Sequence, residues 1–445
     1  MHNTPTLRYP AKISKYYLFK LSIPIFFSNL ALPLASLVDI GLMGHLSNES
    51  FLAATSIATS VITMIFWSFG FLRMGTVGIV SQALGKGDYR EIVSTLMRNL
   101  IIAIVISLII IISSNQILRL VTHFFNPSDE TNILIGQYIS IRVLSAPAEL
   151  SLYVLVGLYL GLQKTKISSF MITFFCLLNI IISSYFVLYL DLEIFGVALG
   201  TLIAAYFTIL IFLAFTYFYI KNKFNIIPRV RKVLIAKKII ALLNINFNIF
   251  IRTILLTFAF LWVTLQGSKL GEEFLAINSI LMQFVILSSF FLDSYAFSTE
   301  GVIGYSVGQK NIRSFKRAVA SSISLSFYTG LLISIFYIFF FKFIINALTD
   351  IDYLRFLSYE FIIWVILMPP IASFCYQYDG IFIGASQTTE IRNAMIVSVA
   401  LFIMLSLYCV KHFGNHGLWF SLVFFMAIRS ITLLISFKNI LKKFK

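Results

Sequence analysis

Long hydrophobic runs alternate with short polar tracts along this 445-residue chain. Each run is close to or above the roughly 20 apolar residues that an α-helix needs to cross a bilayer. Lipid offers no hydrogen-bond partner to exposed backbone groups, so helices are the expected form of such runs. The pattern predicts an all-α integral membrane protein with twelve transmembrane helices, over residues 16–43, 51–84, 92–119, 133–162, 168–190, 194–220, 239–267, 274–308, 314–345, 353–386, 393–411 and 416–437.

Composition excludes a soluble domain. Hydrophobic residues make up 59% of the chain and charged residues 12%, and the mean hydropathy is +0.93. A soluble domain carries about 25% charged residues. The net charge is +16, but the basic residues form short tracts between the runs rather than a groove or stripe. We therefore expect membrane lipids, and not nucleic acid, as partners.

The Lys and Arg residues indicate the orientation of the chain. If both termini lie on the inner side, the inner tracts hold 25 of these residues, the outer tracts hold five, and four lie inside runs. Cytoplasmic loops carry such an excess of positive charge. The asymmetry predicts an even number of spans, with both termini in the cytoplasm and the chain in the inner (plasma) membrane. The first run is too long, and too directly followed by a second, to be a cleaved signal peptide.

An internal repeat divides the chain into halves. FLAATSI at Phe51 recurs as FLAINSI at Phe274, an offset of 223 residues. The same offset pairs glycines, prolines and an arginine over more than a hundred residues: Gly44 with Gly267, Gly78 with Gly301, Gly85 with Gly308, Arg90 with Arg313, Pro147 with Pro370, Gly157 with Gly380 and Gly161 with Gly384. We predict two six-helix lobes in parallel orientation, residues 1–220 and 239–445, joined by a cytoplasmic linker over 221–238.

Two repeated motifs predict local structure. The GxxxG pairs at Gly157/Gly161 and Gly380/Gly384 allow a neighbouring helix to approach closely, so we expect them to serve packing. Residues 85–88 and 308–311 have the composition of turns that end a helix.

Asp39 is the first candidate functional residue, because it places a carboxylate inside an apolar run. An ionisable group in a membrane span is costly unless it is paired, hydrated or used. The alternative is a structural carboxylate that is bonded to neighbouring hydroxyls or amides. Pro24 and Pro33 lie on the same run and each removes a backbone donor, so we expect a helix that bends near its charge, with these prolines as the hinge.

Further polar residues of the first half are candidates for the same site. Asn179 and Ser183 are four residues apart, hence on one helix face, where an amide and a hydroxyl could join a proton or ion network with Asp39. Thr201 lies in the next run. For Asn179 and Thr201, structural and functional roles are equally open.

The second half offers its own candidates. Asp293 and Glu300 are seven residues apart and share a helix face, while Arg252 and Asp379 lie on other runs. We expect opposite charges to neutralise one another, although the sequence does not say which pairs form, and the role of Arg252 stays open. Glu300 is expected near the cytoplasmic end, in a solvated or salt-bridged position.

No metal, cofactor or catalytic motif is indicated. The three cysteines lie in apolar runs without ligand spacing and are predicted to be core residues. Only His412 and His416 share helical spacing, and they could bind a metal only if the chain broke at Gly414. The chain lacks GxxxxGK[ST], so ATP-driven transport by this chain alone is not expected. We expect a protein that is not an enzyme and needs no cofactor.

Several long segments, in this order, resemble the multidrug and toxic compound extrusion (MATE) family and its DinF branch: IPIFFSNLALPLASLVDIGLMGHL, FLRMGTVGIVSQALGKGD, IRVLSAPAELSLYVLVGLYLGLQ, LDSYAFSTEGVIGYSVGQ, YDGIFIGASQTTEIRNAM and GNHGLW. The resemblance runs from about Lys20 to Lys438. It implies twelve helices in two lobes, the N-lobe and the C-lobe, around a central cavity. It also implies efflux of organic, often cationic, compounds in exchange for protons or sodium ions.

The resemblance also assigns roles by position. Asp39 looks like the carboxylate that binds the coupling ion, with Asn179 and Thr201 as its polar partners, and Pro24 looks like the bend. Relatives commonly carry an aspartate where this chain has Ser183, a difference that weakens a sodium site and favours protons. Asp293 and Asp379 match acidic positions of the second lobe, so the lobe that holds the coupling ion is left open.

The resulting hypothesis is a monomeric efflux antiporter that works by alternating access. The first alternative is a flippase for lipid-linked oligosaccharides, which needs a strongly cationic cavity face, with Arg73, Arg142 and Arg252 as candidates. The second is a membrane-embedded transferase, which predicts that histidines and acids pair at one membrane face.

Overall fold

A computed structural model describes residues 13–44, 49–224 and 233–444, and all regular structure in these ranges is helical. Eleven of the described helices are long and apolar enough to cross a membrane. The last of them, α15 (Thr388–Leu441), contains a break at Gly414, where φ is +56° and ψ is −134°. Division of α15 at this glycine gives twelve spans, in agreement with the hydropathy pattern.

The first half of the chain contains more helices than spans. The run predicted over 51–84 is interrupted after Ser68, and the run predicted over 92–119 ends at Ile112 and continues into a separate amphipathic helix. A 3-10 turn interrupts the fourth run just before Pro147. The helices are α1 (Lys15–Gly44), α2 (Glu49–Ser68), α3 (Phe71–Lys86), α4 (Tyr89–Ile112), α5 (Ser114–Phe125), α6 (Asp129–Arg142), η1 (Val143–Ser145), α7 (Ala146–Gly161), α8 (Thr165–Leu188) and α9 (Glu193–Phe224).

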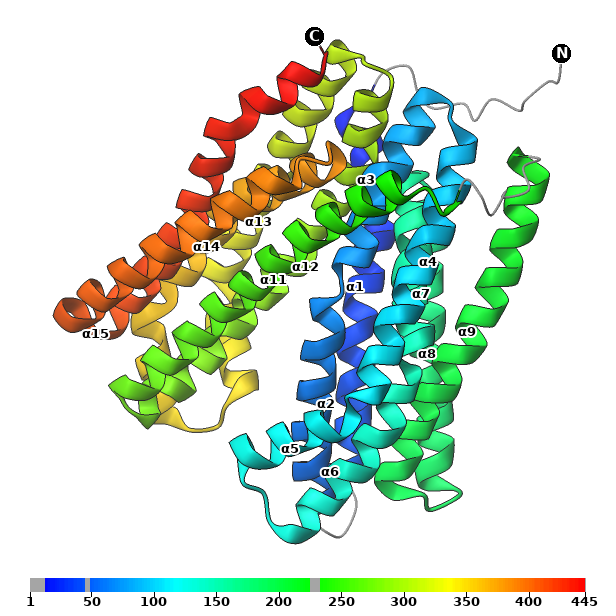
Figure 1. Ribbon diagram of the computed structural model, residues 1–445. Helices are drawn as coiled ribbons and strands as arrows, with labels where there is room; N and C mark the ends of the chain where they lie inside the picture. The colour runs from blue at the N-terminus through cyan, green and yellow to red at the C-terminus, as the bar shows by residue number, and fades with distance from the viewer. Residues whose placement is uncertain (1–12, 45–48, 225–232, 445) are drawn as a thin grey trace, which may run out of the picture. The chain divides into compact units, whose positions relative to one another are not determined.

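The second half has longer and fewer helices (Figure 1). Pro369 and Pro370 lie inside α14 without ending it. The helices are α11 (Ala236–Leu270), α12 (Glu272–Gly308), α13 (Ile312–Leu348), α14 (Asp352–Gly384), α15 and η2 (Lys442–Phe444).

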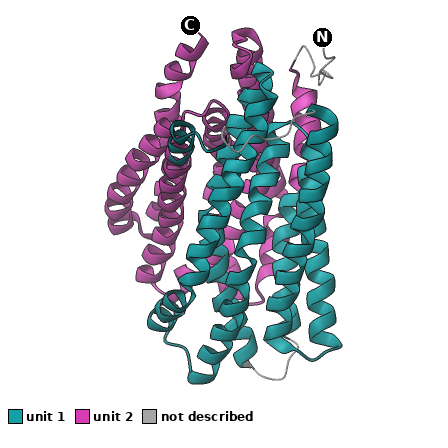
Figure 2. Cartoon of the chain, turned by 45° about the vertical axis from the view of Figure 1, so that its right-hand side comes forward, with its two compact units in different colours: residues 1–9, 27–243 teal, residues 10–26, 244–445 magenta. Residues whose placement is uncertain are grey.

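The described residues form two compact units, which Figure 2 shows in different colours. Of the described residues, unit 1 comprises those between 27 and 243, and unit 2 comprises 13–26 and those from 244 onwards. The division falls within two helices. The start of α1, up to Phe26, belongs to unit 2, and the start of α11, up to Leu243, belongs to unit 1. Each of these helices therefore contributes to both units.

Each unit uses the same packing contact, as the repeat predicts. A Cβ atom on Gly157 of α7 would lie 2.6 Å from the carbonyl oxygen of Arg73 in α3. A Cβ atom on Gly380 of α14 would lie 2.7 Å from the carbonyl oxygen of Ala296 in α12. Arg73 and Ala296 are themselves 223 residues apart. The glycines therefore serve close helix packing, which is the role that the GxxxG pattern predicts.

The predicted helix-ending turns are also present. Asp88 caps α4, since its Oδ1 accepts from the backbone N–H of Glu91 at 3.0 Å. Asn311 caps α13 in the same way through the N–H of Ser314, also at 3.0 Å. These caps satisfy donors that the first turn of a helix leaves without partners.

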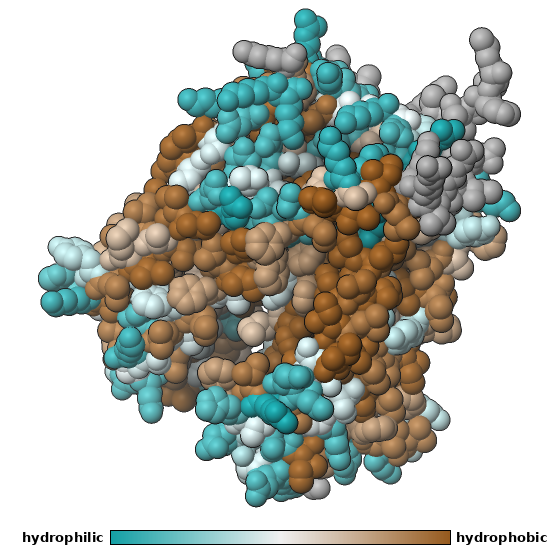
Figure 3. All heavy atoms as spheres, viewed as in Figure 1, coloured by the Kyte–Doolittle hydropathy of each residue, from teal (hydrophilic) through white to brown (hydrophobic). Residues whose placement is uncertain are grey.

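The surface agrees with a membrane setting. On the face shown in Figure 3, hydrophobic residues cover the middle of the helices and hydrophilic residues gather at their ends. Large side chains such as Leu210, Phe339 and Ile435 are more than 60% exposed within the spans. Lipid is a favourable environment for such side chains, whereas water is not.

Candidate functional site

Asp39 lies on the part of α1 that belongs to unit 1, and it is 7% exposed. The Ser183 hydroxyl of α8 hydrogen-bonds its carboxylate. The other carboxylate oxygen, Oδ1, is buried without a hydrogen-bond partner. A buried acceptor without a partner is costly, and more so when it carries charge. One oxygen of Asp39 is therefore available to a proton or a cation.

The amide of Asn179 connects Ser183 to α9. Its Nδ2 donates to Thr201 Oγ1 at 2.7 Å and to Ser183 Oγ at 3.3 Å. Thr201 in turn donates to the carbonyl of Val197 at 3.0 Å. The four residues predicted in the first half thus lie together in unit 1. Their part in transport stays a prediction.

An ion pair that was not predicted lies beside this group. Arg142, at the end of α6, is 2.6 Å from Glu149 of α7, and the Ser145 hydroxyl between them hydrogen-bonds both side chains. Arg142 also interacts electrostatically with Asp39, as does Tyr138, which hydrogen-bonds Arg142. The seven-residue spacing of Arg142 and Glu149 was a signal for this pair. No sequence feature singled out Tyr138.

The charges of this group decide what it can bind. Arg142 and Glu149 neutralise each other. With Asp39 ionised, the three side chains carry one net negative charge, and with Asp39 protonated they are neutral. A net charge in a dry site is unfavourable unless a counter-charge compensates it. The group can therefore exchange one proton for one cation without leaving a charge uncompensated.

In unit 2, Asp379 is held by two arginines. Arg252 of α11 and Arg429 of α15 both pair with its Oδ2, and the second contact is 2.7 Å long. All three residues are less than 9% exposed. The predicted neutralisation of Arg252 and Asp379 is present, with Arg429 as a partner that the sequence did not indicate. Asp379 is thus already compensated by fixed positive charge.

The other candidates are more scattered. Asp293 is half-buried and interacts electrostatically with Tyr376. Glu300 is 1% exposed, so of the two positions expected for it, solvated or salt-bridged, the solvated one is excluded. The helix α1 continues across Pro24 and Pro33 without interruption. The role of these prolines as a hinge stays a prediction.

The 223-residue offset shows that the polar group belongs to one unit. Asp39 corresponds to Trp262 and Ser183 to Ser406, and the Trp262 indole donates to Ser406 Oγ at 2.8 Å. A neutral hydrogen bond in unit 2 therefore replaces the acid. The counterparts of the remaining polar residues Tyr138, Arg142, Glu149 and Asn179 are Phe361, Val365, Ala372 and Phe402, all in the hydrophobic core of unit 2.

The described residues contain neither a disulfide nor a cluster of potential metal ligands. All three cysteines are buried and unpaired, as predicted. The chain does break at Gly414, but no group of three or more potential metal ligands is found in the described part. His416 accepts from the Trp364 indole at 3.0 Å and lies 3.4 Å from Glu360. Among the residues that the structure describes, this exposed pair is a contact of the kind that the transferase alternative predicts.

Comparison with known proteins gives a consistent result. The MatE family model matches residues 24–185 and 248–408, one match in each half. DNA damage-inducible protein F of Escherichia coli K12 is 31% identical over 416 residues, which cover 94% of this chain and 90% of that protein. Multidrug export protein MepA of Staphylococcus saprophyticus is 24% identical over 200 residues, covering 43% of this chain and 44% of that protein.

Solved structures share the fold. One described as the outward-facing conformation of a multidrug resistance MATE family transporter has a TM-score of 0.86 at 19% identity, with 97% of both chains covered. The family match, the relatives and the fold agree. The chain belongs to the MATE family of transporters, in the branch of DNA damage-inducible protein F, and is a multi-pass membrane transporter rather than an enzyme.

Proposed function

We propose that this transporter exports hydrophobic or cationic organic compounds from the cytoplasm in exchange for protons. The observation that carries the proposal is the buried Asp39, which has one carboxylate oxygen without a partner. A proton neutralises this acid on one side of the membrane, and an organic cation displaces the proton on the other. Proton and substrate thus compete for a single negative charge, which is the coupling that exchange requires.

Protons are favoured over sodium by the composition of the site. Ser183 stands where a second acid could bind a metal ion, and Glu149 is committed to Arg142. One carboxylate is sufficient for a proton, because a proton needs one oxygen. Sodium needs several oxygen ligands and remains the alternative coupling ion.

Unit 1 is the better candidate for the coupling site. Asp379, the buried acid of unit 2, is paired with two arginines, and the counterpart of Asp39 in unit 2 is Trp262. An acid with fixed counter-charges gains little from a further cation. We then propose that the remaining candidates of the second lobe stabilise its fold or line the substrate path. These are Arg252, Asp293 and Glu300.

The helix α1 offers a physical link between coupling and movement. Its first part belongs to unit 2 and its second part, with Asp39, to unit 1. In alternating access, movement between the units must be absorbed within the two helices that they share, α1 and α11. Pro24, and further along Pro33, lack the N–H that would stiffen α1, and they are the proposed hinge.

The available energy is sufficient for accumulation. One pH unit supplies about 1.4 kcal/mol per proton. A membrane potential of roughly 60 mV supplies the same amount only when the exported compound is uncharged, because one-for-one exchange of a proton for a monovalent cation moves no net charge. That amount supports about tenfold accumulation of substrate. From the positive charge of the inner tracts we propose that the protein lies in the inner membrane with both termini in the cytoplasm. We propose separately that it works as a monomer.

The flippase alternative is less well supported. It needs arginines whose charge is free to hold a pyrophosphate. Two of the three candidate arginines, Arg142 and Arg252, are paired with acids, and the third, Arg73, is buried on α3 at 8% exposed. The net negative charge that Asp39, Arg142 and Glu149 carry when Asp39 is ionised favours a cationic substrate instead.

The test uses proteoliposomes that contain the full-length protein and a fluorescent cation, with proton and sodium gradients imposed separately. We expect the proton gradient, and not the sodium gradient, to drive transport by the wild type. Asp39→Asn is expected to lose this transport, whereas Asp352→Asn, which removes an exposed acid, retains it. Transport by Asp39→Asn that still follows the proton gradient would contradict the proposal.

A further inference from the structure

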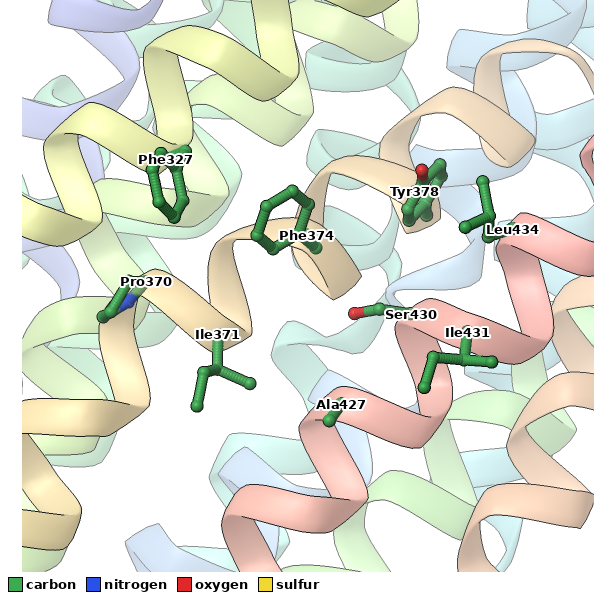
Figure 4. Close-up of a pocket in the computed structure, with 9 residues that line it drawn as sticks. All are labelled: Phe327, Pro370, Ile371, Phe374, Tyr378, Ala427, Ser430, Ile431 and Leu434. Atoms are coloured by element: carbon green, nitrogen blue, oxygen red, sulfur yellow. The ribbon is translucent and has the colours of Figure 1, made fainter.

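Unit 2 contains a crevice that the proposed transport cycle does not use. It has a volume of about 370 Å³ and lies between α13, α14 and α15 (Figure 4). Pockets that hold small ligands are typically about 300–1,000 Å³. The residues that matter here are Phe327 on α13, Pro370, Phe374 and Tyr378 on α14, and Ile431 and Leu434 on α15.

The crevice lies at the proline pair of α14. Pro370 has no N–H to donate to the carbonyl of Ile366 one turn earlier, and that carbonyl accepts from the Ser334 hydroxyl of α13 at 2.6 Å instead. The backbone is thus satisfied by a neighbouring helix. The ring of Pro370 is left to line the crevice.

The lining is apolar and carries no charge. Its two polar residues are Tyr378 and Ser430, and the Ser430 hydroxyl is committed to the carbonyl of Met426 at 3.0 Å. Ile431 and Leu434 are 49% and 53% exposed. The lining offers no counter-charge to a cation, and its apolar surface fits a hydrocarbon chain.

The same helix faces continue into a basic rim, which we define as Lys316, Lys438 and Lys442. On α15, Lys438 is seven residues beyond Ile431 and shares its helix face. Lys442 follows four residues later, at the start of η2, which continues directly from α15. On α13, Lys316 is eleven residues before Phe327 and shares that face. All three lysines are exposed.

The two basic helix ends are adjacent. Phe315 at the start of α13 stacks on Phe437 near the end of α15, with ring centroids 5.9 Å apart. Phe437 also contacts Tyr378 of the crevice, at 6.4 Å between centroids. The helix rise places Lys438 about 6 Å beyond Leu434 and Lys316 about 16 Å from Phe327. An apolar slot thus leads to a cluster of positive charge at the end of the same helices.

We propose that this crevice and its basic rim bind one anionic phospholipid. An acyl chain occupies the apolar crevice, and the lipid phosphate is held by Lys316, Lys438 and Lys442. Basic pockets between transmembrane helices have the chemistry to hold anionic headgroups. The site lies within unit 2, and the proposal does not depend on the coupling role of Asp39.

The experiment measures lipid binding to the purified full-length protein by native mass spectrometry. Phosphatidylglycerol and phosphatidylethanolamine with the same acyl chains are the two probes. We expect the wild type to prefer phosphatidylglycerol. The variant Lys316→Gln/Lys438→Gln/Lys442→Gln should lose this preference, by roughly fivefold for each lysine. The matched control removes three exposed lysines of unit 1, with Lys166→Gln, Lys221→Gln and Lys223→Gln together, and should keep the preference.

A second pair of variants tests the crevice itself. Ala427→Leu and Ala427→Phe add increasing volume to its lining and should weaken binding of both lipids in that order. Equal binding of the two lipids by the wild type, or an unchanged preference in the triple lysine variant, would overturn the proposal. Full lipid binding by the Ala427 variants would also overturn it. If the Ala427 variants lost binding of tetraphenylphosphonium, a lipophilic cation, but kept binding of both lipids, the crevice would be assigned to a transport substrate instead.

Discussion

Asp39 and Trp262 occupy equivalent positions in the two repeats, and each hydrogen-bonds the serine that the repeat also places there. Both units therefore keep the contact with this serine, and only unit 1 has an acid at this position. Ser183 accepts the Asn179 amide and bonds the carboxylate. An acidic side chain at position 183 would therefore lie next to Asp39 and form a pair of carboxylates, whereas serine leaves Asp39 as a single acid.

Replacement of Ser183 by Asp is expected to change the coupling ion. Two adjacent carboxylates cannot both ionise easily without a cation between them, so a sodium ion becomes the natural counter-charge. Efflux by Ser183→Asp, measured in proteoliposomes, should respond to an imposed sodium gradient. Ser183→Ala serves as the control and should gain no sodium response. Efflux by Ser183→Asp that depends on protons alone would contradict this expectation.

Among the helices, the repeat and the hydropathy pattern predicted most of what is seen. The repeated glycines indicated that α7 and α14 each have a closely packed neighbour, because only glycine leaves room for a carbonyl at such a distance, but they did not indicate that the neighbours are α3 and α12. The interruption after Ser68 and the separate helix α5 were not predicted, since hydropathy alone does not distinguish one span from two shorter helices. Pro147 was the sequence feature that marked the position of the 3-10 turn, because a proline favours the start of a new helix.

A side chain at Gly157 is expected to separate α7 from α3. The Cβ of Gly157→Val would lie 2.6 Å from a backbone oxygen, which cannot move without the whole helix. Overpacking of this kind costs about 1–3 kcal/mol. A thermal-unfolding assay in detergent should show a lower midpoint for Gly157→Val, and likewise for Gly380→Val.

Gly136→Ala is the matched control, because a Cβ there meets only the Leu118 side chain at the ordinary distance of 3.4 Å. This change should leave the midpoint equal or slightly higher, since Ala favours helix. Equal midpoints for all three variants would show that the glycine contacts do not contribute to stability.

For the whole molecule, two units share one architecture, and the polar group around Asp39 is confined to one of them. The sequence alone indicated the span count, the repeat and the candidate acids. The seven-residue spacing of Arg142 and Glu149 was compatible with their pairing, but nothing in the sequence indicated that Arg429 joins Asp379. Ion-pair partners that are distant in the sequence depend on tertiary packing, which hydropathy does not record. The division of α1 and α11 between the units has the same origin.

Proton release on substrate binding tests the central claim most directly. Purified protein in a weakly buffered detergent solution is mixed with a lipophilic cation, and a pH-sensitive dye reports the protons released. Competition for one charge predicts about one proton per bound cation from the wild type and none from Asp39→Asn. Equal proton release from both proteins would show that Asp39 is not the group that exchanges a proton for the substrate.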